Sequence, residues 1–320
     1  MPQFGFSTTA DELLEGKDLS GRTILVTGAY SGLGRETARA LAAKGAHMIL
    51  SGRDATKLSA AADEIAALSG AKIDTLVCDL ASLAAIRAAG AEARERFAHI
   101  DVLINNAGVM APPLGRTEDG FETQFGTNHL GHFLLTRELM SLLQQSSAAR
   151  IVNLSSRGHH LSPVDFDDPN YARRDYAKWP AYGQSKTANV LFTAGLEQRF
   201  GPQGIHAVAV HPGGINTNLG RHMSDEDRAF LTARIKKLAE DSGKPASGFK
   251  TIPQGAATTV WAATADELEG RGGLYAEDCH IAEVDDTNPT SGVRSYALDK
   301  DNADRLWALS EQLVGDKFAD

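Results

Sequence analysis

Cysteine is scarce in this chain of 320 residues, which contains only Cys78 and Cys279. Each cysteine ends an apolar run, and neither has companions at the spacing typical of metal ligands. So few cysteines exclude a fold held together by a disulfide framework. We therefore expect two buried free thiols and a reducing compartment, the cytoplasm.

Long apolar runs and clusters of positive charge are also lacking. No uninterrupted apolar stretch approaches the ~18 residues of a transmembrane helix, and the N-terminal residues lack the basic region and apolar core of a signal peptide. The formal net charge is −9, and no Lys/Arg cluster interleaves with aromatic residues. These absences argue against a membrane span and against nucleic acid as the main partner.

The chain has no Pro/Gly/Ser-rich linker, composition shift or internal repeat at which it could be divided. Although length alone would suggest about two domains, we predict a single domain over residues 21–300, after an N-terminal extension over residues 1–20. Residues 301–320 are expected to form a C-terminal helix and tail, because Leu306, Trp307, Leu309 and Leu313 recur at near-helical spacing. This helix should pack on the domain.

Short apolar runs alternate with longer helical patterns along most of the sequence. The alternation is typical of a parallel sheet covered on both faces by helices. The predicted strands are 23–27, 46–50, 73–77, 102–104, 150–154, 205–210 and 273–275. The predicted helices, rich in Ala, Leu and Glu, are 35–44, 55–68, 82–97, 121–143 and 181–200. Right-handed crossovers then give the predicted fold class, an α/β doubly wound parallel sheet of the Rossmann-like type.

Two long segments, 157–180 and 218–252, fall outside this alternation. Open α/β sheets bind ligands at the carboxyl ends of their strands, where such insertions lie, so both are candidate substrate walls. For 157–180 a solvated loop is an equally good interpretation. In 218–252 an amphipathic helix offers Phe230, Leu231, Ile235 and Leu238 to one face, between Gly220 and the glycines of 243–248. We interpret this second segment as a mobile lid, and an ordinary surface helix is the alternative.

A glycine-rich turn, Thr27-Gly-Ala-Tyr-Ser-Gly-Leu-Gly34, joins the first predicted strand to the first helix. Glycines let the backbone turn tightly and approach phosphate groups, and a helix N-terminus offers free N–H groups and the positive end of its dipole. Because the turn opens an alternating α/β chain, it predicts a site for the pyrophosphate of a dinucleotide. A purely steric role for the glycines is the alternative.

The end of the second predicted strand bears on the choice of cofactor. An NAD site usually places Asp or Glu there for the ribose hydroxyls, whereas this chain has Ser51-Gly-Arg53, and an arginine accommodates a 2′-phosphate. NADP is therefore favoured as the cofactor. Asp54 keeps NAD open, since its carboxylate could turn toward the ribose while Arg53 served only as a solvated charge.

A tyrosine and a lysine, Tyr182 and Lys186, stand four residues apart in a predicted helix. Positions i and i+4 share one helix face, so the ammonium of Lys186 can lie beneath the Tyr182 phenol and favour its ionised form. A phenol that normally titrates near ~10 could then exchange a proton at cellular pH. The pair predicts proton transfer coupled to hydride transfer.

These motifs occur in the order seen in short-chain dehydrogenases/reductases. The landmarks are the Thr27–Gly34 turn, Asp79-Leu80, Asn105-Asn-Ala-Gly108, Asn128, Ser155-Ser156, Tyr182-x-x-x-Lys186, and His211-Pro-Gly-Gly214 with Thr217. Each is modest alone, but seven in order are very specific, and the resemblance covers roughly residues 20 to 280. The run from Asn128 to Thr136 and the phrase Tyr275-Ala-Glu-Asp-Cys279 look most like the retinol-dehydrogenase and WW-domain-oxidoreductase branch.

The resemblance implies a catalytic role for four residues. Tyr182 would be the general acid or base, and Lys186 would lower its pKa and bond the nicotinamide ribose. Ser156 would donate a hydrogen bond to the developing oxyanion, with Ser155 as the competing candidate. Asn128 would hold a water that relays protons from Lys186, or would simply bend its helix.

The resemblance also implies a set of cofactor contacts. Asp79 and Leu80 would meet the adenine, and Thr217 would lie near the phosphates. The full expected set, besides Tyr182 and Lys186, is Gly28, Tyr30, Ser31, Gly32, Leu33, Gly34, Arg53, Asp79, Leu80, Asn106, Ala107, Gly108, Pro212, Gly213, Ile215 and Thr217.

The expected function is therefore an NADP-preferring oxidoreductase that interconverts an alcohol and its ketone or aldehyde, on an apolar substrate. An NAD-dependent steroid or polycyclic-alcohol dehydrogenase, and a non-catalytic NADP-binding sensor or scaffold, are the alternatives. Metal binding is not expected, because His129 with His132 and His159 with His160 lack a completing carboxylate or cysteine. The expected partner is a small-molecule alcohol or carbonyl compound, and assembly as a homo-oligomer stays open.

Overall fold

The computed structural model describes residues 4–242 and 248–318, and within them eight strands form one sheet. The strand order is β3-β2-β1-β4-β5-β6-β7-β8, with parallel neighbours except for the antiparallel pair β7 and β8. The strands are β1 (Thr23–Thr27), β2 (His47–Gly52), β3 (Ile73–Val77), β4 (Val102–Asn105), β5 (Arg150–Leu154), β6 (His206–His211), β7 (Leu274–Glu277) and β8 (His280–Ile281). The order reverses between β1 and β4, and ligands bind at such a reversal in this architecture.

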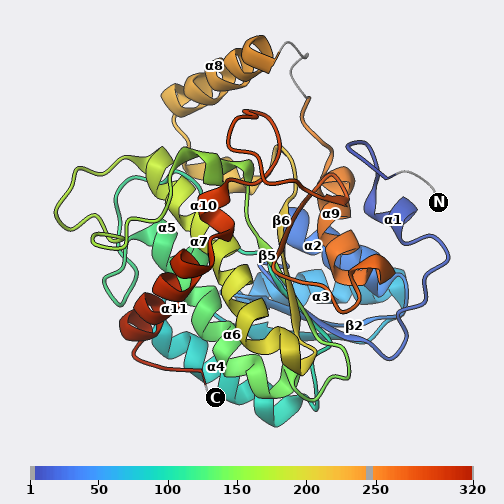
Figure 1. The fold of residues 1–320 in the computed structure, drawn as a ribbon. Helices are drawn as coiled ribbons and strands as arrows, with labels where there is room; N and C mark the ends of the chain where they lie inside the picture. Colours follow the sequence, from blue (N-terminus) through green and yellow to red (C-terminus); the bar gives the residue numbers. More distant parts are fainter. Residues whose placement is uncertain (1–3, 243–247, 319–320) are drawn as a thin grey trace.

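Two layers of helices cover the sheet, one on each face (Figure 1). Successive strand residues point to opposite faces, so Leu25 packs into one hydrophobic cluster and its neighbour Ile24 into the other. The Leu25 side is covered by α4 (Leu83–Arg96), α6 (Gly131–Leu143), α7 (Lys178–Phe200) and α11 (Lys300–Val314). The Ile24 side is covered by α1 (Ala10–Leu13), α2 (Gly32–Ala42), α3 (Ala55–Ser69) and α9 (Ile252–Thr264). This arrangement confirms the predicted fold class.

The segments outside the sheet are tied to these layers. Lys17, after α1, donates to the carbonyl of Thr264 at the end of α9, and its ammonium pairs with Asp266. In α11 the buried Leu306 and Trp307 lie in the core cluster with Phe200 of α7, as the spacing of the last helix predicted. A short helix, α10 (Ser295–Leu298), precedes it.

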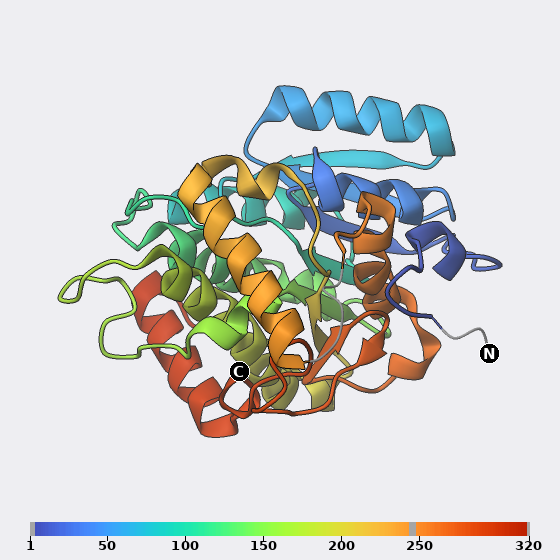
Figure 2. The ribbon, with the colours of Figure 1, turned by 90° about the horizontal axis from the view of Figure 1, so that it is seen from above.

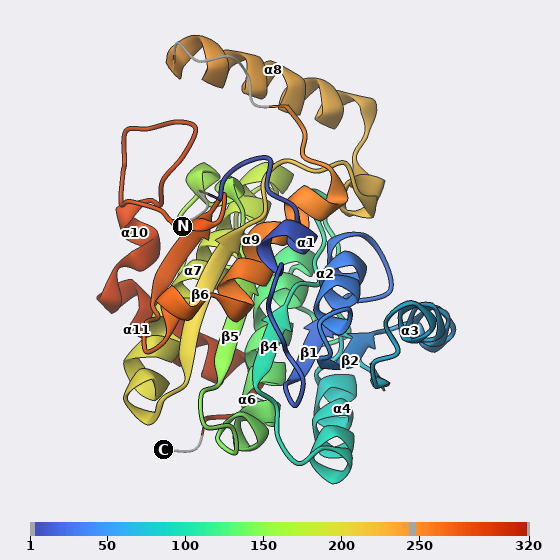
Figure 3. The same ribbon diagram turned by 90° about the vertical axis from the view of Figure 1, so that its right-hand side faces the viewer.

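Helix α8 (Asp225–Ser242) stands away from the packed body and crosses one end of the molecule (Figures 1, 2 and 3). It follows η4 (Asn218–His222), so both lie in the segment predicted to be a lid. Among residues 225–240 of α8, Asp227 alone is buried. The predicted glycine hinge at 243–247 lies outside the described residues.

The sequence misplaced several element boundaries and missed some elements. The helix expected over 121–143 is α5 (Thr123–Phe125), then a π-helical turn, η1 (Gly126–Leu130), then α6. The segment 157–180 begins with η2 (Arg157–Leu161), continues as a loop and ends in the first turn of α7. Among the described residues, α1, α9, α10 and the short β8 are further elements that the alternation did not predict. None of the described helices combines the length and apolar character needed to cross a bilayer.

Candidate active site

A cavity of about 1280 Å³ opens at the carboxyl ends of the central strands, and we call it the main cavity. It is lined by every residue expected to contact the cofactor, from Gly28 in the glycine turn to Thr217 after β6. Ser156, Tyr182 and Lys186 line it too. Asn128 does not, and lies behind the loop that follows β4. The sheet thus brings motifs from the whole chain to one space.

The glycine turn and the loop after β4 are held against each other by Thr27. Its hydroxyl oxygen accepts hydrogen bonds from the N–H groups of Asn106 and Ala107, both at 2.9 Å. The Asn106 amide donates to the Thr27 carbonyl at 2.7 Å. Gly28 has φ +67°, and a Cβ there would lie 3.0 Å from the Cα of Ala107. A side chain at Gly28 would therefore force this loop away.

Three charged residues follow β2. The carboxylate of Asp54 is held by contacts within the protein, whereas Arg53 and Lys57 line the cavity. The Asp54 side chain caps α3 by accepting from the N–H of Lys57, and it pairs with the Lys57 ammonium at 2.7 Å. Arg53 is exposed, and both Arg53 and Lys57 line the main cavity. In the described residues no ion pair engages Arg53, so its guanidinium is free to meet an anion.

Tyr182 and Ser156 lie beside Gly158. A Cβ on Gly158 would lie 2.6 Å from Cε1 of Tyr182 and 3.3 Å from Oγ of Ser156, so only glycine fits there. Ser156 Oγ accepts a hydrogen bond from the Gly158 N–H at 2.9 Å, which leaves the hydroxyl proton to be donated elsewhere. The neighbouring Ser155 is buried and donates to the carbonyl of Lys186 at 2.9 Å. This favours Ser156 over Ser155 as the serine that faces a ligand.

Burial is the first cause of the pKa shifts of both Tyr182 and Lys186. Burial raises the pKa of Tyr182 to about 12, and the nearby Ser156 hydroxyl opposes that rise. Burial lowers the pKa of Lys186 to about 8. The Lys186 nitrogen lies 5.7 Å from the centre of the Tyr182 ring and donates to the Leu154 carbonyl at 3.0 Å. Loss of solvent therefore outweighs the attraction of the ammonium for a phenolate.

Asn128 lies in the π-helical turn η1, a type of helix defect frequent at functional sites. Its side chain pairs with Val109 in both directions: Oδ1 accepts from the Val109 N–H at 2.8 Å, and Nδ2 donates to the Val109 carbonyl at 2.9 Å. Nδ2 also donates to Ser185 Oγ at 3.0 Å. Asn128 thus joins the loop after β4 to helix α7. Its contact on α7, Ser185, stands between Tyr182 and Lys186 in the sequence. The proton relay through a water at Asn128 stays a prediction.

Comparison with known proteins agrees with this geometry. The sequence profile described as short chain dehydrogenase matches residues 22–228, which is more than half of the chain. The chain belongs to the short-chain dehydrogenase family. It is therefore an NAD(P)-dependent oxidoreductase with the fold of that family.

Relatives of this short-chain dehydrogenase cover nearly its whole length. It is 40% identical over 298 residues to human retinol dehydrogenase 13, covering 93% of this chain and 86% of that protein. A crystal structure of an uncharacterised Mycobacterium paratuberculosis protein is 35% identical, with a TM-score of 0.73, and the match covers 98% and 99% of the two chains. A short chain dehydrogenase from Escherichia coli CFT073, solved with NADPH, is 25% identical with a TM-score of 0.62, over 81% and 97%. The likeness to the retinol-dehydrogenase branch is confirmed.

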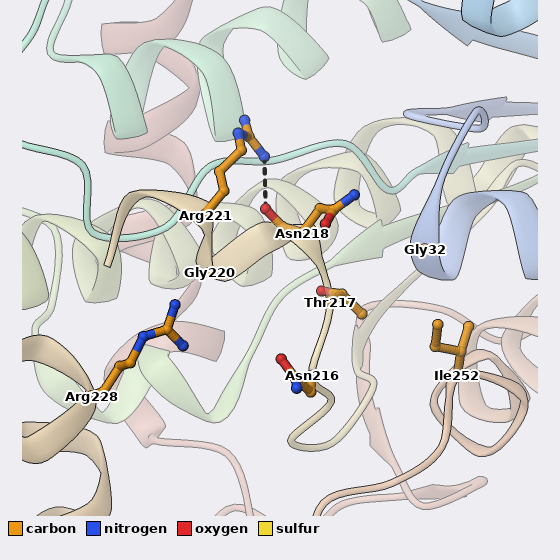
Figure 4. Close-up of a pocket in the computed structure, with 8 residues that line it drawn as sticks. All are labelled: Gly32, Asn216, Thr217, Asn218, Gly220, Arg221, Arg228 and Ile252. Atoms are coloured by element: carbon orange, nitrogen blue, oxygen red, sulfur yellow. Dashed lines mark hydrogen bonds between the residues drawn. The ribbon is translucent and has the colours of Figure 1, made fainter. Parts of the chain in front are cut away.

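A polar pocket of about 390 Å³, which we call the side pocket, adjoins the glycine turn of this dehydrogenase (Figure 4). Gly32 of the turn, Thr217 and Arg228 of α8 line it. Arg221 donates to the carbonyl of Asn218 at 3.0 Å, whereas Arg228 has no hydrogen-bond or ion-pair partner for its guanidinium in the described residues. Sequence reasoning missed Arg228, because nothing in the helical pattern of 224–239 shows which side faces the glycine turn.

The two segments proposed as substrate walls both contribute to the main cavity. From 157–180 only the ends take part, through Arg157, Gly158, Leu161 and Trp179. From α8 the lining residues are Arg228, Leu231, Thr232, Arg234, Ile235 and Leu238. Phe230 stacks on Trp179 at 5.3 Å between ring centres. Three of the four apolar residues expected on the inner face of the lid thus line the cavity, and the fourth contacts its wall.

The histidines and cysteines considered as metal ligands contact other parts of the protein or lie buried in its core. His129 lies 2.8 Å from Ser310 Oγ, and His132 lies 2.9 Å from Thr27 Oγ1 and so supports the glycine turn. Cys78 and Cys279 are buried free thiols, as predicted. In the part of the chain that the structure describes, no group of three potential ligands is arranged to hold a metal ion.

Proposed function

We propose that this short-chain dehydrogenase is an NADP-preferring oxidoreductase that interconverts an alcohol and its ketone or aldehyde, with an apolar substrate. The observation that carries the proposal is the common cavity: Ser156, Tyr182 and Lys186 line the same space as the glycine turn. A sensor or scaffold would have no need for a donor, an acid and a buried lysine beside its nucleotide site.

The chain's own residues would supply the proton chemistry. Bound nicotinamide supplies or accepts the hydride. In the direction of reduction, Tyr182 gives its phenolic proton to the carbonyl oxygen, and Ser156 donates a hydrogen bond to the same oxygen. Since burial keeps Tyr182 protonated up to a pKa of about 12, the phenol is in the donating form at neutral pH. Lys186, charged below its pKa of about 8, stabilises the phenolate that remains.

Three cations support binding of a phosphate-rich dinucleotide. Arg53 and Lys57 stand on the cavity wall after β2, where a 2′-phosphate would distinguish NADP from NAD. Asp54, the residue that could have favoured NAD, is engaged by Lys57 and by the cap of α3. Arg228 faces the side pocket next to Gly32, and an unpaired guanidinium fits a pyrophosphate there. The NADPH complex of the Escherichia coli protein adds support.

The substrate end of the cavity has apolar walls. Leu161 and Trp179 come from the 157–180 segment, and Leu231, Ile235 and Leu238 come from α8. Such walls favour an apolar substrate body and exclude water from the path of the hydride.

The test is a panel of neutral aliphatic and cyclic ketones and aldehydes, with NADPH or NADH, followed by nicotinamide absorbance. We expect turnover of apolar aldehydes or ketones and a higher kcat/KM with NADPH. Binding of NADPH without turnover of any panel member or of the corresponding alcohols with NADP⁺ would support the sensor instead.

A further inference from the structure

Positive charge gathers at the substrate end of the main cavity, although the protein as a whole is acidic. Arg157 follows the proposed catalytic Ser156 directly and lines the cavity. Arg234 reaches the same cavity from α8, two turns beyond the side-pocket residue Arg228. Arg294, in the loop before α10, is a third cation near them.

Arg157 and Arg294 both lie close enough to Arg234 to act on its charge. The pKa of Arg234 is lowered, first by burial and then by repulsion from Arg157 and Arg294. All three also lower the pKa of His160, after the larger effect of its burial, so His160 is neutral with a pKa of about 4 and adds no charge. His160 Nδ1 is buried without a hydrogen-bond partner in the described residues. The three arginines thus lie near His160, and two of them, Arg157 and Arg234, line the cavity.

Two of the three arginines, Arg157 and Arg294, already donate hydrogen bonds to backbone carbonyls of the protein. Arg157 donates to the Thr290 carbonyl at 2.9 Å, and Arg294 donates to the Asp285 carbonyl. Asp285 and Asp286 lie close enough to Arg294 for its charge to lower their pKa values, after the larger effects of their hydrogen bonds. These carboxylates balance Arg294 from outside the cavity lining.

Arg234 has no such partner. It is half-buried, and in the described residues its guanidinium makes no hydrogen bond or ion pair. Among the described side chains, the groups that shift its pKa are Arg157 and Arg294, and neither is a carboxylate. Partial removal of a guanidinium from water beside two other cations costs free energy that a bound anion would recover. A planar carboxylate can accept two of its N–H bonds at once.

We propose that Arg234 and Arg157 form an anion site that selects substrates with an apolar body and a terminal carboxylate. The proposal rests on the proposed function, because it assigns the far end of the substrate in the same cavity. Leu161, Trp179, Ile235 and Leu238 would hold the chain between the two ends, with the carbonyl at Tyr182 and the carboxylate at Arg234.

The test compares medium-chain ω-oxo carboxylates with their methyl esters, which differ in charge at one end. With NADPH we expect kcat/KM to favour the carboxylates by ~10-fold or more, in line with charge-assisted hydrogen bonds. Arg234→Gln should remove that preference by lowering kcat/KM for the carboxylates more than for the esters, and Arg157→Gln should reduce it. The matched control is Lys236→Gln, which removes a positive charge from the outer side of α8, where the Lys236 side chain is 79% exposed.

Two measurements separate this inference from the proposed function. Calorimetry of a medium-chain fatty acid and its methyl ester with the NADPH complex reports anion binding without turnover, and Arg234→Gln should weaken the acid alone. NADPH affinity should not change in this variant. Equal use and equal binding of acids and esters by the unaltered enzyme would overturn the anion site while leaving the dehydrogenase intact. Loss of NADPH affinity in Arg234→Gln would reassign Arg234 to the cofactor.

Discussion

The two halves of the main cavity are built in different ways. The cofactor half consists of residues that follow strands β1, β2, β3, β4 and β6, held together by short hydrogen bonds such as those from Asn106 and Ala107 to Thr27. The substrate half consists largely of η2, the start of α7 and helix α8, in which Asp227 alone is buried among residues 225–240. One half is therefore fixed by the sheet, and the other is attached to it at few points.

This difference separates what the two halves can do. A fixed half preorganises the groups that must meet the cofactor and the reacting atoms. A weakly anchored half has a low free energy of local opening and can admit ligands of different shape. We expect substitutions in the fixed half to have the larger effects on turnover and those in the attached half to act on substrate choice.

The largest effect is expected for Tyr182→Phe in the fixed half. Removal of the phenolic proton should lower kcat by at least ~100-fold, the lower end for a general acid, while NADPH affinity stays near normal. Tyr176→Phe is the matched control, because Tyr176 is not among the residues that line the cavity; its hydroxyl donates to the Pro112 carbonyl and accepts from the Gln124 amide. Steady-state kinetics and a fluorescence titration with NADPH measure both quantities. Retention of most of the turnover would mean that another group supplies the proton.

Arg53→Ala should have the next largest effect, confined to one cofactor. If Arg53 pairs with the 2′-phosphate, its loss should weaken NADPH binding by ~10-fold or more and leave NADH binding almost unchanged. Lys72→Ala controls for the loss of one positive charge at the opposite ends of the same strands, since its side chain is 70% exposed. Equal changes in the Kd of both cofactors would mean that Arg53 does not recognise the 2′-phosphate.

The fixed half is also the half that the sequence predicted. Its residues stand at most seven positions after the ends of strands, and parallel strands end at one edge of the sheet, so local spacing gives three-dimensional position. Tyr182 and Lys186 likewise share a helix face because of their spacing. Arg228 and Arg234 could not be placed in this way, because the side of α8 that faces the cavity depends on packing between distant segments. The pKa of Tyr182 also could not be predicted from its spacing to Lys186, because burial, which raises it, is a property of the whole fold.

Lys186→Met should stabilise the enzyme in the absence of ligands while it removes turnover. The folded-state pKa of Lys186 is about 8 against an ordinary value of 10.5, so charging the buried ammonium at neutral pH opposes folding. We expect the free energy of unfolding at pH 7 to rise by ~1 to 3 kcal/mol, reduced by the lost hydrogen bond to the Leu154 carbonyl.

The pH dependence distinguishes this cause from better packing of methionine. Between pH 8 and 10.5 the unfolded chain binds more protons at Lys186 than the folded protein does, so the stability of the unaltered enzyme should rise with pH in this window. The gain from Lys186→Met should shrink over the same window. Urea unfolding of both proteins at several pH values measures this difference in the free energy of unfolding. A difference that is independent of pH would point to packing.

The smallest effect is expected where α8 is tied to the fixed half. Lys178, in the first turn of α7, donates to Asp227 at 2.6 Å, and the Asp227 carboxylate also accepts from the N–H and hydroxyl of Ser224. Because this pair anchors a helix with little other burial, Lys178→Met should speed hydrogen exchange in α8 and raise KM a few-fold with little change in kcat. Lys236→Met, which breaks the exposed pair with Glu240, should do neither.

Hydrogen exchange with and without NADPH tests the lid itself. If residues 218–252 close over a ligand, their amides should exchange fast in the free enzyme and become protected in the NADPH complex, and further with substrate. Lys178→Met should lower that protection, because more of the binding free energy would be spent on ordering α8. Protection confined to the strands and the glycine turn, with none in 218–252, would make α8 an ordinary surface helix. The origin of substrate choice would then lie in the segment 157–180, where Arg157, Leu161 and Trp179 line the same cavity.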